Sequence, residues 1–158
     1  MQSSTPSIFT ARQIMTGEVV SVQPDTPIEE AADLLEHHGI SGMPVVDEQH
    51  HVVGVLTEYD LLRYIAALEM HGRVADFMTT EVVTVGEDAT VPELADLFRS
   101  TGRRRVPVTS DDGKLIGEIA RRDLIFAGQM RQLMAALPVW TGPGADESQS
   151  APVGQGLR

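Results

Sequence analysis

The sequence contains no cysteine and few aromatic residues. The absence of cysteine from its 158 residues excludes a disulfide framework, a thiolate metal site and thiol catalysis, and it fits an intracellular location. Aromatic residues make up only 4% of the chain, so we expect a core built from aliphatic side chains. No apolar run is long enough to span a membrane, because Arg and Glu interrupt each candidate segment.

Positive charge is also scarce. Lys and Arg together number 12 against 23 Asp and Glu, which gives a formal charge of −11, and Lys114 is the only lysine. A chain this acidic repels polyanions on average, which argues against a nucleic-acid or anionic-membrane partner. The stretch from Met1 to Thr10 lacks the basic region and apolar core of a signal peptide, so we expect a cytoplasmic protein.

What the sequence does have is an internal repeat. The segment from Met15 to Val22 reappears from Met78 to Val85, 63 positions later. The same offset holds without a gap through Asp25/Asp88, Glu30/Glu93, Asp33/Asp96, Gly39/Gly102, Pro44/Pro107, Gly54/Gly117 and Asp60/Asp123. A constant offset over this length predicts two copies of one structural unit.

Each copy carries the same secondary-structure signals. In the first copy we expect a strand over 19–22, a helix that ends at Gly39, strands over 44–46 and 52–56, and a helix over 58–70. Thr26 and Glu29 are spaced as a capping box for the first of these helices, and Thr90 and Glu93 repeat the signal. The second copy predicts strands over 106–108 and 115–119 and a last helix over 121–137. The fold class is therefore α/β, with two tandem β-α-β-β-α units.

The two units should pack against each other, because a single unit this small would leave one face of its sheet in water. Such a pair has a pseudo-twofold axis, with clefts to which both units contribute. We expect unit 1 over 11–70 and unit 2 over 71–137. A flexible N-terminus over 1–10 and a disordered tail over 138–158 complete the chain.

One candidate for chemistry lies where a strand ends and a helix begins. Thr57 offers a hydroxyl and Asp60 a carboxylate, which together could hold the two hydroxyls of a ribose. The same pair could equally be a helix cap that needs no ligand. The second copy keeps Asp123 but has Ala120 in place of the threonine, so the two potential sites are unequal.

Arginines provide a second candidate. Five of the eleven lie in two short stretches of the second copy, 103–105 and 121–122, where they could bind phosphate through their planar guanidinium groups. The alternative is that Arg103 and Arg105 pair with the surface carboxylates Asp111 or Asp112. The histidines have no spacing that favours a metal site, so no metal is expected.

The tandem unit, the Met-Thr and Val-rich opening, the Pro-Val-Val-Asp strand and the Gly-x-x-Thr-x-x-Asp ending resemble a stand-alone pair of CBS domains, a Bateman module, over about 11–128. The resemblance implies two α/β units stacked through their sheets, often as part of a larger dimer. It also implies binding of an adenosine-containing ligand such as AMP, ADP, ATP, S-adenosylmethionine or NAD, for regulation rather than turnover.

The resemblance also implies site residues. Thr57 and Asp60 match the ribose-binding positions of the family, and the other unit supplies the surroundings of the base and the phosphates: Val82, Val83, Arg103, Arg104 and Arg122. A second, weaker site would use Asp123 with Val19, Val20, Ser41, Gly42 and Met43. No cation stands at Ser41 or Gly42, which argues against strong phosphate binding there.

Three functional classes follow. The first, and our prediction, is a regulatory module without catalysis of its own that binds an adenine nucleotide, requires no cofactor, forms a homodimer and acts on a separate protein. The second is an enzyme, but the chain has no Gly-x-Ser-x-Gly, no phosphate loop and no His-Glu-x-x-His motif. The third is a ligand-free dimeric scaffold that contacts a partner protein.

Overall fold

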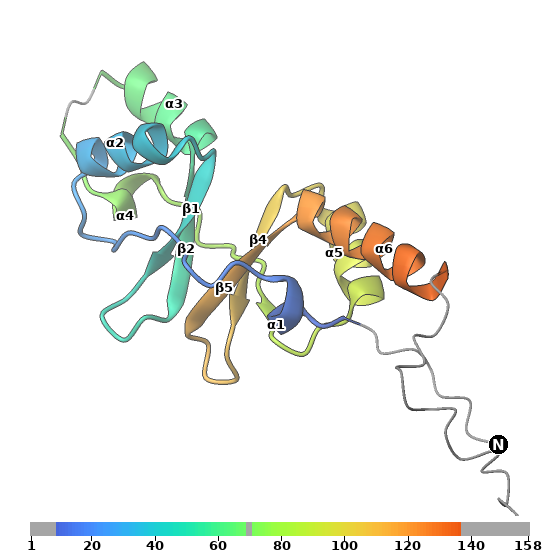
Figure 1. The fold of residues 1–158 in the computed structure, drawn as a ribbon. Coiled ribbons are helices and arrows are strands. Elements are labelled where there is room, and N and C mark those ends of the chain that lie inside the picture. Colours follow the sequence, from blue (N-terminus) through green and yellow to red (C-terminus); the bar gives the residue numbers. More distant parts are fainter. Residues whose placement is uncertain (1–8, 69–70, 137–158) are drawn as a thin grey trace, which may run out of the picture.

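The computed structural model describes residues 9–68 and 71–136, which form two similar halves (Figure 1). The first half contains the helix α2 (Ile28–His38), the strands β1 (Gly42–Val46) and β2 (Val52–Thr57), and the helix α3 (Glu58–Ala66). The second contains β3 (Val85–Gly86), α5 (Val91–Thr101), β4 (Arg105–Thr109), β5 (Leu115–Ala120) and α6 (Arg121–Ala136). Two one-turn helices, α1 (Ala11–Ile14) and α4 (Val74–Phe77), precede the halves along the chain.

The strands form two small sheets, and the helices lie on their outer sides (Figure 1). β1 pairs antiparallel with β2, and β4 pairs antiparallel with β5 in the matching register, while β3 lies parallel to β4. Both hairpins were predicted from their alternating apolar residues and polar turns. This mixture of strands and helices in two equivalent halves confirms the α/β fold class.

The strand expected over 19–22 is wrong: only Val22 reaches the sheet, through one parallel bridge to Val45. The reason is that the segment before it crosses between the halves. The N–H of Thr16 donates to the carbonyl of Glu118 in the second half at 2.9 Å, whereas the N–H of Val22 donates to Pro44 in the first at 3.2 Å. Because residues 17–21 connect the second half to the first, they are not available to pair within one sheet.

The helix ends follow the sequence signals with two exceptions. Gly39 and Gly102 end α2 and α5 at φ values of +60° and +66°, as expected for the left-handed conformation that glycine adopts easily. The capping box of α5 is present, since Thr90 Oγ1 accepts from the N–H of Glu93. That of α2 is wrong: the repeat places Pro27 at the capping position, and the Thr26 hydroxyl accepts from the N–H of Gln23 at 3.0 Å instead.

The second exception is α3, which ends at Ala66 although the sequence predicts helix to Met70. Leu68 already has a φ of +51°, a left-handed conformation that a helix interior does not contain. Met70, and Leu137 at the expected end of α6, lie outside the described residues.

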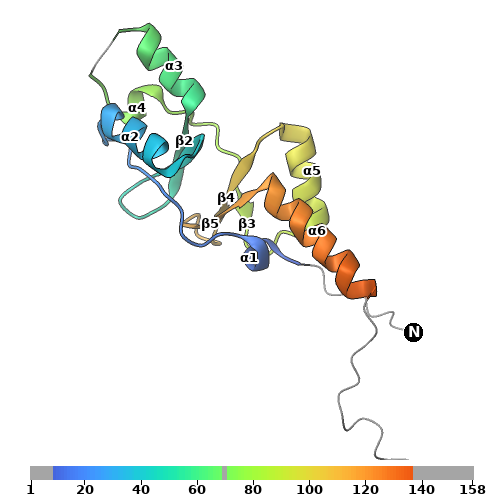
Figure 2. The same ribbon diagram turned by 45° about the horizontal axis from the view of Figure 1, so that its top comes forward.

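Neither short helix packs on the half that directly follows it along the chain: α1 packs on the second half and α4 on the first (Figures 1 and 2). Ala11 of α1 is fully buried in the core of the second half, and its N–H donates to Ala89 at 2.7 Å. Val74 and Phe77 of α4 belong to the core of the first half, and the N–H of Val74 donates to Thr26 at 2.9 Å. Each core is therefore completed by a segment that belongs to the other sequence repeat.

The Met-Thr pair that follows each short helix lies against the repeated glycine of the half on which that helix packs. A Cβ atom on Gly54 would lie 2.8 Å from Sδ of Met78 and 3.1 Å from the carbonyl oxygen of Thr79. A Cβ atom on Gly117 would lie 3.0 Å from the carbonyl oxygen of Thr16 and would also collide with the side chain of Met15. The glycines are needed because the crossing segments run directly over them.

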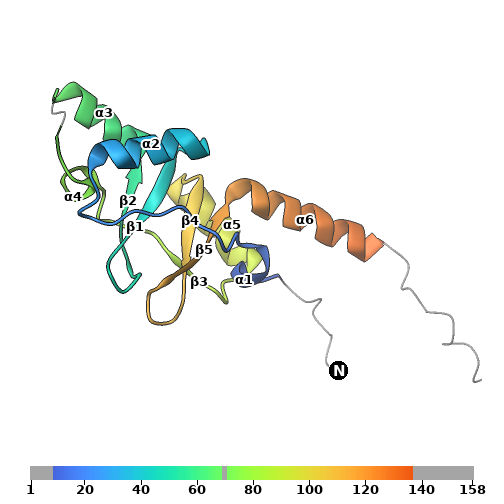
Figure 3. The same ribbon diagram turned by 60° about the vertical axis from the view of Figure 1, so that its left-hand side comes forward.

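The cores consist mainly of aliphatic side chains, as the composition predicts. Ile28 and Leu56 are at most 1% exposed in the first half, and Leu94 and Ile119 are fully buried in the second. Each such side chain contributes about 1.5–3 kcal/mol of burial free energy. The halves also touch at their hairpin turns, where His50 accepts from Leu115 at 3.0 Å (Figure 3).

The domain boundaries at 11–70 and 71–137 stay a prediction, as do the flexible ends. The segments 1–8 and 138–158 lie outside the described residues. Phe9 and Thr10 are described, and the carbonyl of Phe9 accepts from Val91 at 3.2 Å. Within the described ranges, no helix combines the length and the apolar character needed to cross a bilayer.

Candidate functional site

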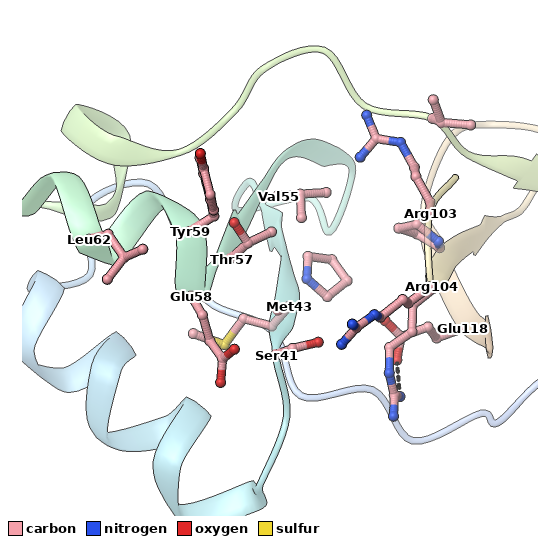
Figure 4. A pocket seen from close by; sticks show the side chains of 15 residues that line it. Ser41, Met43, Val55, Thr57, Glu58, Tyr59, Leu62, Arg103, Arg104 and Glu118 are labelled. Atoms are coloured by element: carbon pink, nitrogen blue, oxygen red, sulfur yellow. Dashed lines mark hydrogen bonds and ion pairs between the residues drawn. The ribbon is translucent and has the colours of Figure 1, made fainter. Parts of the chain in front are cut away.

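A cleft of about 670 Å³ lies between the two halves and is lined by both (Figure 4). We call it the interface cleft. Its lining includes the residue pairs Ser41/Arg104, Gly42/Arg105, Pro44/Pro107 and Val55/Glu118, whose members stand 63 positions apart in the sequence. Equivalent residues of the two repeats therefore face the same space, which places the cleft on the pseudo-twofold axis.

The wall from the first half is mostly apolar. Met43 and Val55 come from β1 and β2, and Thr57 adds a hydroxyl where β2 passes into α3. Tyr59 and Leu62 of α3 stand at the edge of the cleft, 79% and 58% exposed (Figure 4). A planar apolar group could therefore pack against this wall, with the Thr57 hydroxyl beside it.

The wall from the second half is basic. Arg103 and Arg104 lie across the cleft from Thr57 and Tyr59, and the guanidinium group of Arg104 points toward Ser41 (Figure 4). Neither arginine forms an ion pair with a carboxylate of the described residues. Two free guanidinium groups beside an apolar wall suit an amphiphilic anion.

Arg105 is paired, but not with the carboxylates considered from the sequence. It contacts Glu118 at 3.2 Å, because β4 and β5 place the two side chains on one face of the hairpin. Asp112 instead pairs with Lys114 at 3.6 Å. Arg105 therefore does pair with a carboxylate, as the alternative held, but the named partners Asp111 and Asp112 are wrong, and Arg103 pairs with no carboxylate of the described residues.

Glu118 is the more buried of the two carboxylates that line the cleft. Its side chain is 15% exposed. Burial raises the pKa of Glu118 above its usual value, the charge and hydrogen bond of Arg105 offset only part of this rise, and the negative charge of Asp123 adds to it. Glu118 therefore binds a proton more readily than a carboxyl group in water.

Asp60 supports Thr57 from behind. Its Oδ2 accepts from the N–H of Thr57 at 2.9 Å and from the Thr57 hydroxyl at 3.0 Å, and its Oδ1 accepts from the hydroxyl of Thr79 at 3.4 Å. Asp60 is only 8% exposed. The pair is therefore a capping box, which also holds the Thr57 hydroxyl in place at the cleft, while binding of a ribose by the pair stays a prediction.

The structure brings together seven of the predicted site residues in the interface cleft: Thr57, Val83, Arg103, Arg104, Ser41, Gly42 and Met43. The last three were expected in the weaker site and share this space with the first four. The lining does not include Asp60, Val82, Arg122, Asp123, Val19 or Val20. Of these, Val20 packs against the core of the first half, and Arg122 and Asp123 line a groove between α1 and α6.

Sequence reasoning missed several residues that line the cleft, above all Tyr59 and Glu118, and it included Arg105 only as a member of the arginine run 103–105. One signal could have found some of them. Arg105 belongs to the arginine run, and Glu118 stands two residues before Ala120, the equivalent of Thr57, so both lie close in sequence to positions already singled out. Tyr59 stands 63 positions before Arg122, a predicted site residue that does not itself line this cleft.

No group of three or more His, Cys, Asp or Glu that could hold a metal ion occurs in the described part of the chain. The interface cleft itself offers hydroxyl, guanidinium and two separate carboxylate groups. Such a set suits an organic anion rather than a metal.

Two repeated α/β units that share a ligand-sized cleft at their interface define a paired ligand-binding module. Residues 11–67 and 74–129 match the CBS domain family, and the chain therefore belongs to that family as a tandem CBS pair. This confirms the resemblance on which the site residues were assigned.

Relatives include both small and large proteins. The uncharacterized 17.7 kDa protein in the bps2 3' region of Acidianus ambivalens is 35% identical over 115 residues, which cover 73% of this chain and 70% of that protein. Inosine-5'-monophosphate dehydrogenase of Aquifex aeolicus is 37% identical over 107 residues. The match covers 67% of this chain but only 22% of that enzyme.

Solved structures show the same fold. CBSX2 of Arabidopsis thaliana in complex with AMP superimposes with a TM-score of 0.70 at 30% identity, over 78% of this chain and 98% of that one. The CBS domain pair of MJ0100 in complex with 5-methylthioadenosine and S-adenosyl-L-methionine gives 0.68 at 27% identity, over 78% and 99%.

Proposed function

We propose that this protein is a regulatory module that binds an adenine nucleotide of the AMP, ADP or ATP class in the interface cleft. The observation that carries the proposal is the composition of that cleft: an apolar wall with a fixed hydroxyl from one half, and from the other Arg103 and Arg104, which pair with no carboxylate in the described part of the chain. A nucleotide has the same division between an apolar base, a sugar and a charged end.

In this proposal the base lies against the apolar side chains of the cleft, including Val83, while the ribose hydroxyls meet Thr57. Arg103 and Arg104 take the first phosphate. Asp60 acts mainly by holding the Thr57 hydroxyl, since its own oxygen atoms already accept three hydrogen bonds. Arg122 belongs to the region beyond the first phosphate, whereas Asp123, Val19 and Val20 keep only the weaker second site.

The ligands of related proteins support this assignment. CBSX2 has been crystallised with AMP, and the MJ0100 pair with two adenosyl compounds. S-adenosylmethionine or NAD therefore stays the alternative ligand for the same cleft. The relatedness to inosine-5'-monophosphate dehydrogenase concerns a part of that enzyme, and we propose that the CBS pair has no catalysis of its own.

Regulation follows from the position of the cleft. A ligand that contacts both halves favours the arrangement in which both sets of contacts form, and only this difference in affinity can shift the equilibrium between arrangements. The regulated protein is then a separate chain that distinguishes the two arrangements. A cytoplasmic location is part of the proposal, and imaging of the tagged full-length protein tests it.

We also propose a homodimer. Apolar side chains are exposed on the two equivalent helices: Tyr59, Leu62 and Ile65 on α3, and Ile125 and Phe126 on α6. Exposed apolar residues gathered on one side of a helix are typical of protein interfaces. Sedimentation equilibrium measures the mass directly, and a monomer at micromolar concentration would contradict this part.

Calorimetric titration with AMP, ADP, ATP, NAD and S-adenosylmethionine tests the binding proposal. We expect micromolar affinity for at least one adenine nucleotide. Thr57→Ala and Arg104→Gln should each weaken it about tenfold, because each removes a hydrogen-bonding group from the cleft. Arg99→Gln is the matched control, since Arg99 is exposed on α5 beside Asp96. If every compound binds more weakly than millimolar, the ligand-free scaffold replaces this proposal.

A further inference from the structure

A second space lies away from the interface cleft, between α1 and α6 of the second half. It measures about 670 Å³, and none of its lining residues also lines the cleft. We call it the helix groove, because α1 and the first turns of α6 form its walls (Figure 3). Most of its lining side chains are apolar: Phe9, Ile14, Ile125, Phe126, Ala127 and Met130.

The first half has an aromatic pair at the equivalent place. Tyr64 of α3 meets Phe77 of α4 edge-on, with ring centroids 5.5 Å apart and ring planes at 89°. Phe77 is buried in the core of the first half, and Tyr64 packs against that core. The residues 63 positions away in the second half are Ala127 and Ile14, which both line the helix groove. The groove therefore lies where the first half places two aromatic rings.

The side chains around the groove differ in exposure. Ala127 is only 6% exposed, whereas Ile125 and Phe126 are 65% and 64% exposed. A small buried residue thus lines the inside, and two large apolar side chains on the same helix remain in contact with water. An apolar group that enters the groove would cover part of this surface, and the removal of apolar surface from water is favourable.

The candidate occupant is the segment that follows α6. The chain continues from 137 to 158 after Ala136, the last residue of α6, and this part lies outside the described residues. Its first four residues, Leu-Pro-Val-Trp over 137–140, are apolar, whereas 141–158 consist mostly of glycine, proline and polar residues. Trp140 is the only tryptophan of the chain. A tryptophan side chain has a large apolar surface and gains much from burial.

The segment 137–140 also continues the repeat. Trp140 stands 63 positions after Phe77, which in turn stands 63 positions after Ile14. The three segments 11–14, 74–77 and 137–140 share an apolar residue at the first and at the fourth position. In α1 and α4 the fourth residue packs against the core of a half. Each half already holds one such segment, and the helix groove is the space beside α1 that could take a third.

The length of the segment allows it to reach the groove. Met130 stands six residues before Ala136, which is about 9 Å along the helix axis. Four residues in extended conformation span about 13 Å, so Trp140 can fold back as far as Met130. Its side chain then extends from that end of the groove toward Ala127.

We propose that the segment 137–140 docks in the helix groove of its own chain, with the indole ring of Trp140 in the place that an aromatic pair fills in the first half. Gln13 and Gln129 also line the groove, so the indole N–H can donate to an amide oxygen there. Docking would cover the apolar face of α6 and complete the second half. The inference does not depend on the proposed function.

Tryptophan fluorescence of the full-length protein tests the docking directly, because Trp140 is the only tryptophan. We expect emission at shorter wavelengths than in the urea-unfolded chain, and protection from quenching by acrylamide. Ala127→Tyr gives the second half the aromatic residue of Tyr64 and should fill the groove, so the emission should shift to longer wavelengths and the protection should be lost. Ala66→Tyr, at an exposed position of α3, is the matched control and should change neither property.

A second variant keeps the test decisive if Ala127→Tyr does not fold, which circular dichroism checks. Met130→Glu places a charge at the end of the groove that Trp140 would occupy, and it should also remove the protection from acrylamide. Gln132→Glu makes the same change of charge at an exposed position two residues further along α6 and should leave the protection intact.

Three outcomes would overturn the proposal. The first is an emission spectrum of the native protein that matches that of the unfolded chain. The second is protection that the groove variants leave unchanged, or that the control variants reduce equally, because Trp140 is then buried elsewhere. The third is protection that disappears on dilution, which would show that a second copy of the chain covers Trp140. None of these outcomes bears on nucleotide binding, which calorimetry tests separately.

Discussion

Glu118 combines two properties: its side chain is largely buried, and it lines the interface cleft. Its equivalent in the first repeat is Val55, so a buried carboxyl group occurs at this position in the second repeat only. Arg105, on the neighbouring strand, is the cation that faces it, and Asp123 is the nearby charge of the same sign. Burial is the largest influence on how this carboxyl group titrates, Arg105 offsets it in part, and Asp123 adds to it.

Replacing Glu118 by Gln should make protein stability less dependent on pH. Because the folded-state pKa is raised above its usual value of 4.5, the contribution of Glu118 to stability is complete below that value and is lost as the pH rises through the raised pKa. The wild type should therefore lose stability relative to Glu118→Gln as the pH rises above 4.5. Urea unfolding at a series of pH values measures the difference.

A matched control is Glu93→Gln, at an exposed capping position where the amide can still accept the backbone hydrogen bond. It should not reproduce the trend. A free-energy difference between wild type and Glu118→Gln that stays constant, or that moves the other way with pH, would contradict the assignment of burial as the dominant influence on this carboxyl group.

At the scale of elements, the crossing segments depend on two glycines in β2 and β5. Gly54→Ala should destabilise the protein by about 1–3 kcal/mol, because the added methyl group would lie 2.8 Å from Sδ of Met78 and 3.1 Å from the backbone of Thr79. The methionine can move, but the carbonyl of Thr79 pairs with the N–H of Val55 and cannot easily shift.

Gly86→Ala is the control, because a Cβ atom at this position would have no neighbour within 4 Å and the φ of Gly86 is not left-handed. It should change the free energy of unfolding by less than about 0.5 kcal/mol. Chemical denaturation of both variants measures this, and equal effects would show that the close approach over Gly54 has no energetic consequence.

The elements also show what a sequence can and cannot foretell. The hairpins and the glycine ends of α2 and α5 follow from local patterns, and the structure contains them. The capping signal at Thr26 fails because its position relative to the helix start is shifted by one residue from that of Thr90. The strand expected over 19–22 fails because its residues cross between halves, which no local pattern records.

The same holds for the candidate site. Repetition and the start of α3 point to Thr57, and the arginine run points to Arg104, since both signals are local. The exchange of α1 and α4 is not visible, because Ala11 and Val74 look like ordinary members of their own repeats. The pairing of Arg105 with Glu118 is likewise a product of strand register, which the sequence leaves open.

At the scale of the whole molecule, the boundaries of a foldable half differ from those of a sequence repeat. The core of the first half needs Val74 and Phe77, which follow the first repeat. A fragment of residues 17–80 contains that entire core. A fragment of residues 1–70 lacks Val74 and Phe77, and it includes α1 without the second half on which α1 packs. We expect the first fragment to be the more stable.

The loss should be large, since truncation of one buried phenylalanine alone costs about 3–5 kcal/mol, a large part of the stability of a small domain. Urea unfolding followed by circular dichroism compares the two fragments. The fragment of residues 17–80 should show a cooperative transition and that of residues 1–70 should not. A more stable 1–70 fragment would show that α4 is dispensable.

The exchange of α1 and α4 has an evolutionary consequence. A chain with a single repeat, built on this plan, could complete its core only by lending its short helix to a second copy and receiving one in return. Such an ancestor is an obligate pair with two identical faces on its axis. Once two copies are fused into one gene, the two faces no longer need to be identical, because the residues of each repeat can be substituted independently. In this chain the equivalent positions Ser41/Arg104, Glu58/Arg121 and Val55/Glu118 carry different residues, as this independence allows.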